Sequence, residues 1–232
     1  LDCCLSEIFL DNEYNLEYKI VDFKTYPYDR TTKDIIKKAL SQIKSDINTA
    51  DIYLGKLFLD FSKDFIKSRK IDLIGSHGQT ILHNDKITTL QIGNPKFLKS
   101  YFKVPTIFNF RKNDIIYQGN GAPLVSFLDW LLFKEHSKDI ILLNIGGISN
   151  VTYINTEGNR SNVIGFDTGP GMCMIDHYVK RIWNHSMDYN GKYSNKGKVI
   201  SSVLDILMNN SFIRKQPPKS ACTSIFELDI IL

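Results

Sequence analysis

Polar glycine-rich turns, each beside an apolar segment, are the feature that most constrains how this chain can fold. In the most informative one, GFDTGPG at 165–171, Asp167 stands in a turn that is predicted to open a helix. The others are GSHGQT at 75–80, GNGAP at 119–123 and NIGGISN at 144–150. Such turns aim side chains and backbone N–H groups at one small polar volume. They predict an enzyme that handles phosphate and a polyhydroxylated ligand.

The composition is that of a globular protein with a buried core. Of the 232 residues, 43% are hydrophobic and 23% are charged, both ordinary values. The net charge of +4 is dispersed along the chain, which argues against a nucleic-acid partner. No apolar stretch approaches the roughly 18 residues needed to span a bilayer, so we expect no membrane partner.

The cysteines and the chain ends complete this description. Four cysteines show no metal-binding spacing, and we expect them to be reduced in a cytoplasmic protein: Cys3, Cys4, Cys173 and Cys222. Leu1 lies inside a predicted strand, and the apolar run 230–232 carries no stop signal. We therefore interpret the sequence as a partial chain.

The apolar pattern of the first half predicts a series of short elements. In order they are a hairpin (3–9 and 16–23), helices from near 33 and over 47–69, a buried strand 71–74, a hairpin (79–83 and 87–92), a helix through 101 and a strand 104–110. Thr31 and Thr32 are predicted to cap the first helix. The buried stripe of the second helix is expected to be Ile52, Leu57, Phe61 and Phe65.

The second half continues the mixture of helices and strands. Its predicted elements are a helix from Pro123 to about Glu135, strands 140–145, 149–154 and 163–166, and helices 172–184 and 196–209. The polar stretch 136–139 is the best candidate boundary. This α/β pattern predicts two lobes, 1–137 and 138–232, with the ligand in the cleft between them.

The Gly146-Gly147 pair between two apolar strands predicts a tight hairpin, because both glycines can take positive φ. Without β-carbons, the backbone N–H groups of this turn can approach phosphate oxygens. The amides of Asn144 and Asn150 can donate into the same volume. A plain hairpin with no ligand is the alternative.

The turn at Asp167 favours a polar ligand because a helix start offers free N–H groups. Asp167 itself can accept hydrogen bonds from sugar hydroxyls or hold water around a metal. The alternative is that Asp167 only caps the helix, a role with a typical contribution of about 1 kcal/mol.

His77 directly follows a predicted buried strand, and α/β enzymes place ligands at the C-terminal ends of strands. With Gln79 and Thr80 it predicts a polar strip that contacts the ligand. A histidine that is satisfied within its own loop is the alternative for His77 alone. His83 is expected to be structural.

Asp114 is the carboxylate that we select as a general base. It is expected in a loop between a strand and a glycine turn, where it can stay ionised and reach the cleft. A base has to lie within about 3 Å of the proton that it takes. A surface salt bridge with Arg111 is the alternative.

The glycine-rich motifs described above, in their order along the chain, resemble those of the anhydro-N-acetylmuramic acid kinases of bacterial peptidoglycan recycling. The matching stretches are GSHGQTILH (75–83), QIGNP (91–95), FRKNDIIYQGNGAPL (110–124), NIGGISN (144–150), GFDTGPG (165–171) and PPKS (217–220). Residues 1–9 resemble the tail of the family's first phosphate motif, GTS-L-D-G-x-D, entered at Leu1-Asp2. The stretches are jointly specific, although each alone is weak.

The resemblance implies the two-lobe fold of actin, sugar kinases and Hsp70, here without its extreme N-terminus and C-terminal part. It implies a reaction in which water opens the 1,6-anhydro ring while ATP phosphorylates the freed oxygen at carbon 6. Magnesium would be held mainly through the phosphates. The partners would be the anhydro-sugar and ATP, and the resemblance is compatible with a homodimer.

The resemblance also implies residue roles. Asp114 would activate the water at carbon 1. Phosphate binding would fall to Asp2, Cys3, Asn144, Gly146 and Gly147. Sugar binding would fall to His77, Gln79, Thr80, Asn120, Asp167, Thr168 and Gly169.

The chain departs from the family pattern at several motif positions. Cys3 and Leu5 stand where the phosphate motif has glycine and aspartate. Further departures are Asn109, Gln118, Asn120, Met172 and the stretch 221–224. They leave open a second hypothesis, a catalytically silent, truncated remnant that at most binds sugar. A third, another ATPase of the same superfold such as a chaperone or a glycolytic kinase, is disfavoured by the GSHGQT and GAPL stretches.

Overall fold

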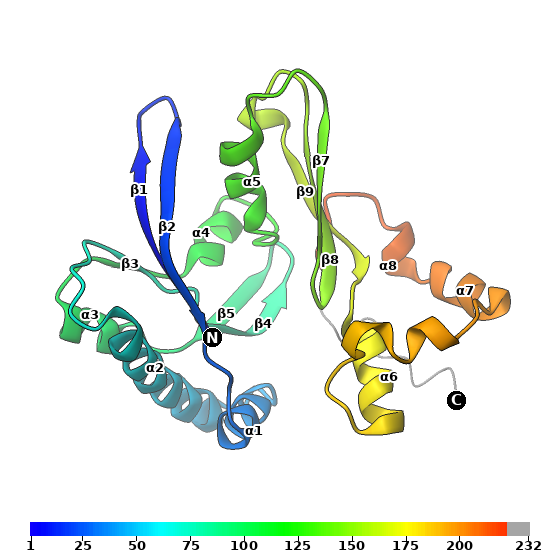
Figure 1. The fold of residues 1–232 in the computed structure, drawn as a ribbon, viewed down its shortest axis with the longest axis horizontal. Helices are drawn as coiled ribbons and strands as arrows, with labels where there is room; N and C mark the ends of the chain where they lie inside the picture. Colours follow the sequence, from blue (N-terminus) through cyan, green and yellow to red (C-terminus); the bar gives the residue numbers. More distant parts are fainter. Residues whose placement is uncertain (222–232) are drawn as a thin grey trace. The chain divides into compact units, whose positions relative to one another are not determined.

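The computed structural model describes residues 1–221, so the predictions about Cys222 and about 222–232 lie outside the described residues. The chain divides into two compact units, Leu1–Gly121 and a second that begins at Ala122 (Figure 1). Both mix helices with strands, as predicted. The predicted lobe boundary after residue 137 remains a prediction.

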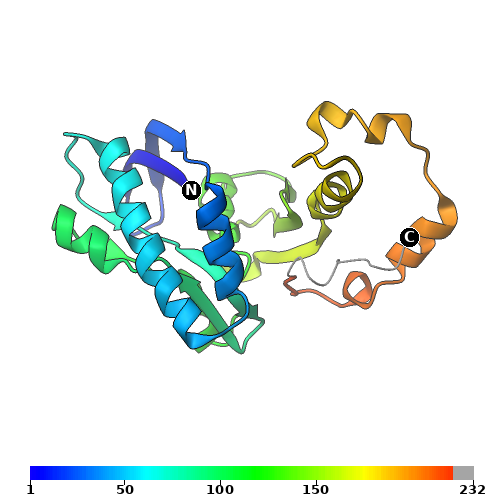
Figure 2. The ribbon, with the colours of Figure 1, turned by 90° about the horizontal axis from the view of Figure 1, so that it is seen from below.

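The first unit contains, in chain order, β1 (Asp2–Leu10), β2 (Leu16–Thr25), α1 (Arg30–Ala39), α2 (Lys44–Ile66), β3 (Ile74–Gly75), β4 (Gln79–Asn84), β5 (Thr88–Ile92), α3 (Lys96–Phe102), β6 (Thr106–Ile107) and α4 (Phe110–Ile116). β1 pairs with β2 and β4 with β5, both antiparallel, which confirms the two predicted hairpins. The short β3 and β6 pair in parallel. Figure 2 shows α1 and α2 packed against each other along the edge of this unit.

The second unit contains α5 (Val125–Phe133), β7 (Ile140–Ile145), β8 (Ile148–Ile154), a 3-10 turn, β9 (Ile164–Pro170), α6 (Cys173–Trp183), two further 3-10 turns, α7 (Ser201–Met208) and α8 (Ser211–Arg214). β7, β8 and β9 form one antiparallel sheet in that order. Helix α5 packs on β8. Within residues 1–221, no helix combines the length and the apolar character that a membrane crossing requires.

The core of the first unit lies where α1 and α2 meet the β4–β5 hairpin. Its buried members are Ala39, Ala50, Leu54, Phe58, Ile81 and Ile92. The predicted stripe of α2 was wrong in part, because Ile52 is 48% exposed whereas Leu54 and Phe58 are buried. The buried face is rotated toward these positions because the helix also has to contact β5.

Local side-chain bonds set several element ends. The Asp11 carboxylate accepts the N–H groups of Glu13 and Asn15, both at 2.8 Å, and closes the first hairpin. Helix α1 is capped by Asp29, which accepts the N–H of Thr32 at 2.7 Å. The predicted caps at Thr31 and Thr32 were therefore wrong: the chain turns helical earlier, and the first acceptor upstream is Asp29.

Three predicted elements differ in the structure. The strand 71–74 is reduced to β3 and is not buried, since Leu73 is 58% exposed. The strand 104–110 is reduced to β6, because Asn109 takes a left-handed conformation and the chain enters α4. The last predicted helix, 196–209, is shortened to α7, and the separate short helix α8 follows it.

Candidate functional site

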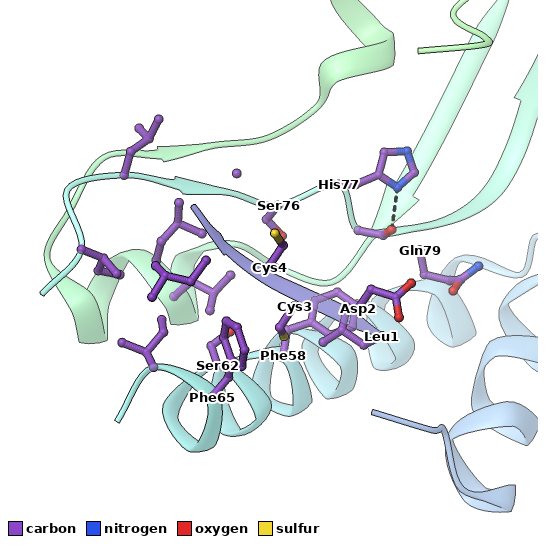
Figure 3. A pocket seen from close by; sticks show the side chains of 18 of the residues that line it. Leu1, Asp2, Cys3, Cys4, Phe58, Ser62, Phe65, Ser76, His77 and Gln79 are labelled. Carbon is purple, nitrogen blue, oxygen red and sulfur yellow. Dashed lines mark hydrogen bonds between the residues drawn. The ribbon is translucent and has the colours of Figure 1, made fainter. Parts of the chain in front are cut away.

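A pocket of about 500 Å³ lies in the first unit, between the start of β1, helix α2 and the turn after β3 (Figure 3). Four predicted site residues line it: Asp2, Cys3, His77 and Gln79. Thr80 follows on β4, where its hydroxyl accepts a bond from Gln91. The structure therefore brings together residues that are more than 70 positions apart in the sequence.

The two ends of this pocket differ in chemistry. Figure 3 shows Asp2, His77 and Gln79 toward one end, and Phe58 and Phe65 toward the other. Asp2 accepts a bond from the Thr25 hydroxyl at 2.6 Å, which orients its carboxylate. Burial is the largest influence on Cys3 and raises the pKa of its thiol, so the uncharged form is favoured there. The thiol is not an anion-binding group.

Both ring nitrogens of His77 are used within the first unit. Nδ1 lies 2.9 Å from the Gly78 carbonyl oxygen, and Nε2 accepts a bond from Arg111 Nε at 2.9 Å. Desolvation by the surrounding atoms lowers the pKa of His77, the Arg111 charge lowers it further, and the bond to Gly78 opposes them. The alternative of a loop histidine that is satisfied by its own chain thus describes this arrangement, and the sugar contact of His77 stays a prediction.

Asp114 lies in helix α4, so its predicted position in a loop was wrong. Its Oδ2 accepts the N–H of Gly121 at 2.6 Å, and its carbonyl accepts the N–H of Gly119 at 2.8 Å. A β-carbon on Gly119 would lie 2.2 Å from Oδ2, so any other residue here would force this carboxylate to move. The residue as a whole stays exposed, which leaves the carboxylate an open side.

Asn120, inside the same turn, is 8% exposed. Its contact with sugar remains a prediction.

In the second unit, the Gly146-Gly147 turn joins β7 to β8 as predicted, but neither glycine has a positive φ. The Gly146 carbonyl accepts the N–H of Met172 at 2.8 Å. The Gly147 carbonyl accepts those of Gly171 at 2.9 Å and Cys173 at 3.1 Å. The chain itself therefore occupies the N–H groups of Gly171, Met172 and Cys173, and an anion site at the start of α6 remains a prediction.

Packing among residues 1–221 does not explain the glycine at 147. A β-carbon added there would meet none of their atoms within 4 Å, and one on Gly146 would make only ordinary contacts, 3.5 Å from Ile148 O. The residue before the pair, Asn144, lies in β7 opposite Asn150, so both predicted amides flank the turn. Open space beside a glycine turn is what close approach of a phosphate would require.

Asp167 is not in a turn, because β9 continues through Pro170. The helix is preceded by Met172 and has no side-chain cap, so the alternative of Asp167 as the cap was also wrong. Asp167 is 6% exposed, and its Oδ2 accepts the N–H of Ala221 at 2.8 Å while its own N–H donates to Lys219 O at 2.9 Å.

The next two residues of β9 are also engaged within the second unit. The Thr168 hydroxyl donates to Ser149 O at 3.1 Å. Gly169 is buried with φ +157°, a conformation that favours glycine. The sugar-binding roles predicted for these two residues and for Asp167 remain predictions.

Sequence reasoning missed three side chains that shape these sites. Arg111 appeared only as a rival ion-pair partner. Lys219 is 4% exposed, and its Nζ donates to Phe212 O at 2.9 Å and Ile213 O at 3.0 Å, which fixes the segment beside Asp167. Asp176 Oδ1 is buried in the first turn of α6 without a hydrogen-bond partner within residues 1–221. The PPKS motif includes Lys219 and the matching stretch 110–124 includes Arg111, but no local pattern signalled Asp176.

No group of three or more His, Cys, Asp and Glu side chains is arranged to hold a metal ion in the described part of the chain. The two sets of predicted residues lie one in each unit. Asp2, Cys3, His77, Gln79, Thr80, Asp114 and Asn120 belong to the first, and Asn144, Gly146, Gly147, Asp167, Thr168 and Gly169 to the second.

Comparison with known proteins identifies the family. Residues 7–232 match the family model described as anhydro-N-acetylmuramic acid kinase. Curated proteins of that name from Bacillus cereus (strain Q1) and Bacillus anthracis are 38% identical over 216 residues. The alignment covers 87% of this chain and 56% of each relative, so the chain spans about half the length of the relatives that it matches. The chain belongs to the anhydro-N-acetylmuramic acid kinase family.

Proposed function

We propose that the protein is an ATP-dependent kinase that opens 1,6-anhydro-N-acetylmuramic acid with water and phosphorylates it to N-acetylmuramic acid 6-phosphate. The reaction would serve peptidoglycan recycling in the cytoplasm. The observation that carries the proposal is Asp114, an exposed carboxylate that a backbone N–H fixes at 2.6 Å. The name of the relatives supplies the substrate class.

The anchoring of Asp114 suits a general base. A base acts efficiently only when its carboxylate is held at the proton that it removes. Gly121 N–H binds one oxygen, and the enclosing turn at Gly119 limits rotation of the carboxylate. The open side of the residue leaves the other oxygen free to accept a proton from water.

In the proposed reaction, Asp114 takes a proton from water as the water oxygen bonds to carbon 1. The bond from carbon 1 to the 6-oxygen breaks, and that oxygen takes the γ-phosphoryl group of ATP. An alkoxide is a poor leaving group, so transfer of the phosphoryl group stabilises it as it departs. Magnesium, held mainly through the phosphates of ATP, would supply positive charge that offsets the charge developing during transfer.

The Gly146-Gly147 turn would contribute to phosphate binding. The space where a Gly147 side chain would lie is open, so a phosphate oxygen can approach the backbone. Gly146 N–H already donates to Ile148 O at 3.2 Å. Contacts from Gly147 and the flanking Asn144 would therefore carry most of the proposed interaction.

A second candidate function is sugar binding without turnover. It is favoured by Cys3, a half-buried thiol at a position where the family's phosphate motif has glycine. A side chain there narrows the approach of a phosphate to the β1 backbone. In this case the protein would bind the anhydro-sugar but not nucleotide.

The decisive test measures ADP release and phosphorylated sugar with the protein expressed from its natural gene. Asp114→Asn is expected to lower kcat by about 100-fold or more, since general-base catalysis contributes about 10² to 10⁴. Arg30→Lys, at a side chain that is 97% exposed, is the control and should retain full activity. In ¹⁸O-labelled water, the label should appear at carbon 1 of the product.

Three outcomes would contradict parts of the proposal. Full activity of Asp114→Asn would remove Asp114 as the base. A label at carbon 6 would overturn the ring-opening chemistry. Calorimetric binding of the sugar, together with no binding of an ATP analogue and no product, would establish the second candidate instead.

A further inference from the structure

We infer that Arg111 is a positioning residue that holds His77 in a single neutral tautomer and ties it to the turn that anchors Asp114. It lies in α4 and donates from two different nitrogens, to His77 Nε2 and to Gly121 O, each at 2.9 Å. For its effect on turnover the inference rests on the proposed function. For the tautomer it stands on the geometry alone.

The bond between Arg111 and His77 fixes where the imidazole proton lies. A guanidinium has only donors, so His77 Nε2 has to present its lone pair. The partner of Nδ1 is the Gly78 carbonyl oxygen, which can only accept, so Nδ1 carries the proton. The ring is therefore neutral and is defined at both nitrogens.

The second bond of Arg111 reaches the peptide that holds the proposed base. Gly121 O accepts from Arg111 Nη1, while Gly121 N–H donates to Asp114 Oδ2. Loss of the Arg111 bond would therefore let this turn move together with its contact to the carboxylate. One guanidinium thus links the turn at His77 to the turn at Asp114.

This link gives a route from ligand binding to the base. Both His77 nitrogens are already engaged, so a ligand that bonds to the ring has to displace either Arg111 or Gly78 O. Displacement of Arg111 would change its hold on Gly121. Lysine cannot replace this fork, because its single ammonium cannot span the two acceptors with the same planar geometry.

A test has to distinguish two effects of Arg111 on His77, that of its positive charge and that of its hydrogen bond. Arg111 lowers the pKa of His77, and it also lowers that of His83, whose partner Asp85 lies at 3.6 Å. Asp2 lines the same pocket as His77. Arg111→Lys keeps the positive charge and removes the fork, whereas Arg111→Gln removes both.

The test is ¹⁵N NMR of the histidine side chains in the ligand-free protein with its native sequence and in the two variants. In the native protein, His77 should show protonated Nδ1 and unprotonated Nε2. Arg111→Lys should give a mixture of tautomers for His77, with His83 little changed. Arg111→Gln should in addition raise the measured pKa of both histidines. Arg30→Lys is the matched control and should change neither.

The same samples give the functional measurement. If the kinase proposal holds, Arg111→Lys should lower kcat about tenfold or more, with a smaller change in KM, because the base is displaced rather than removed. A His77 tautomer that is unchanged in both variants would overturn the inference. A changed tautomer in a protein without kinase activity would leave the inference standing and refute only the proposed function. Thermal unfolding of each variant excludes a general loss of fold.

Discussion

Two glycine turns, one in each unit, differ in what surrounds the position where a β-carbon would lie. At Gly119, a β-carbon would lie within 2.4 Å of all three atoms of the Asp114 carboxylate group. At Gly147, a β-carbon would meet no atom of residues 1–221 within 4 Å. The first glycine is explained by a contact inside the chain. The second faces open space in the described part of the structure.

The comparison shows how a glycine motif can be assigned a role. At some glycines, atoms of the chain already lie where a β-carbon would be, and replacement of such a glycine should lower stability. Replacement of a glycine that faces open space should instead affect binding. Gly171 belongs to the first class although it lies in the second unit, because its added β-carbon would lie 2.2 Å from Gly146 O. The distinction therefore follows local packing and not the unit.

The largest effect on stability is expected for Gly171→Ala. The atoms that its β-carbon would meet, the carbon and oxygen of Gly146, are backbone and cannot rotate away. We expect the free energy of unfolding to fall by about 3 kcal/mol, at the upper end of typical overpacking costs. Urea unfolding followed by circular dichroism measures it. A loss below about 0.5 kcal/mol would show that the turn adjusts freely and would break the comparison.

Gly119→Ala should have a smaller effect, about 2 kcal/mol, because the Asp114 side chain can rotate out of the way. That rotation also breaks the bond to Gly121 N–H. The double variant Gly119→Ala with Asp114→Ala provides the control in a mutant cycle. The two changes should be less than additive, since removal of the carboxylate relieves the clash. Strict additivity would place the clash elsewhere.

A pH effect should distinguish the turn of the first unit. His77 and His83 both have lowered pKa values, mainly through desolvation, so the unfolded chain binds protons at a higher pH than the folded one. Stability is thus fully present above their ordinary pKa of about 6.5 and falls as the pH drops through that value. His77→Gln should flatten the fall between pH 7 and 5. An unchanged slope would mean that His77 titrates normally.

The smallest effect on stability, but the sharpest test of the comparison, is expected for Gly147→Ala. The free energy of unfolding should change by less than about 0.5 kcal/mol, because the added methyl group would meet no atom within the described range 1–221. Under the proposed function, calorimetry should show weaker binding of an ATP analogue, by about fivefold or more, with sugar binding unchanged as the control. Unchanged nucleotide binding would remove this turn from the phosphate site.

Much of the fold could be predicted wherever a pattern was local. Alternating apolar residues and an intervening polar turn gave both hairpins of the first unit and the β7–β8 hairpin. Helix α3 begins directly after Pro95, as predicted. The predictions failed where a distant contact decides. The strand 104–110 was cut short because Asn109 turns left-handed and starts α4, which then packs near β5.

The candidate site shows the same division. Sequence spacing selected Asp114, His77 and Gly147 as residue types suited to a site. It could not show that Arg111 donates a hydrogen bond to His77, 34 positions away. It also could not show that the Asp167 carboxylate accepts the N–H of Ala221, 54 positions away. Nor could it show that the carbonyls of the glycine pair accept the N–H groups of Gly171, Met172 and Cys173.

By itself, the sequence determined the family, the mixture of helices and strands, and the three hairpins, because each of these depends on residues that are close neighbours along the chain. The tertiary structure alone decided at which glycine an added β-carbon would meet atoms of the chain and at which it would face open space. It also decided which polar side chains are already engaged. Hydrogen bonds and packing act over a few ångströms, and only folding determines which distant residues come within that range.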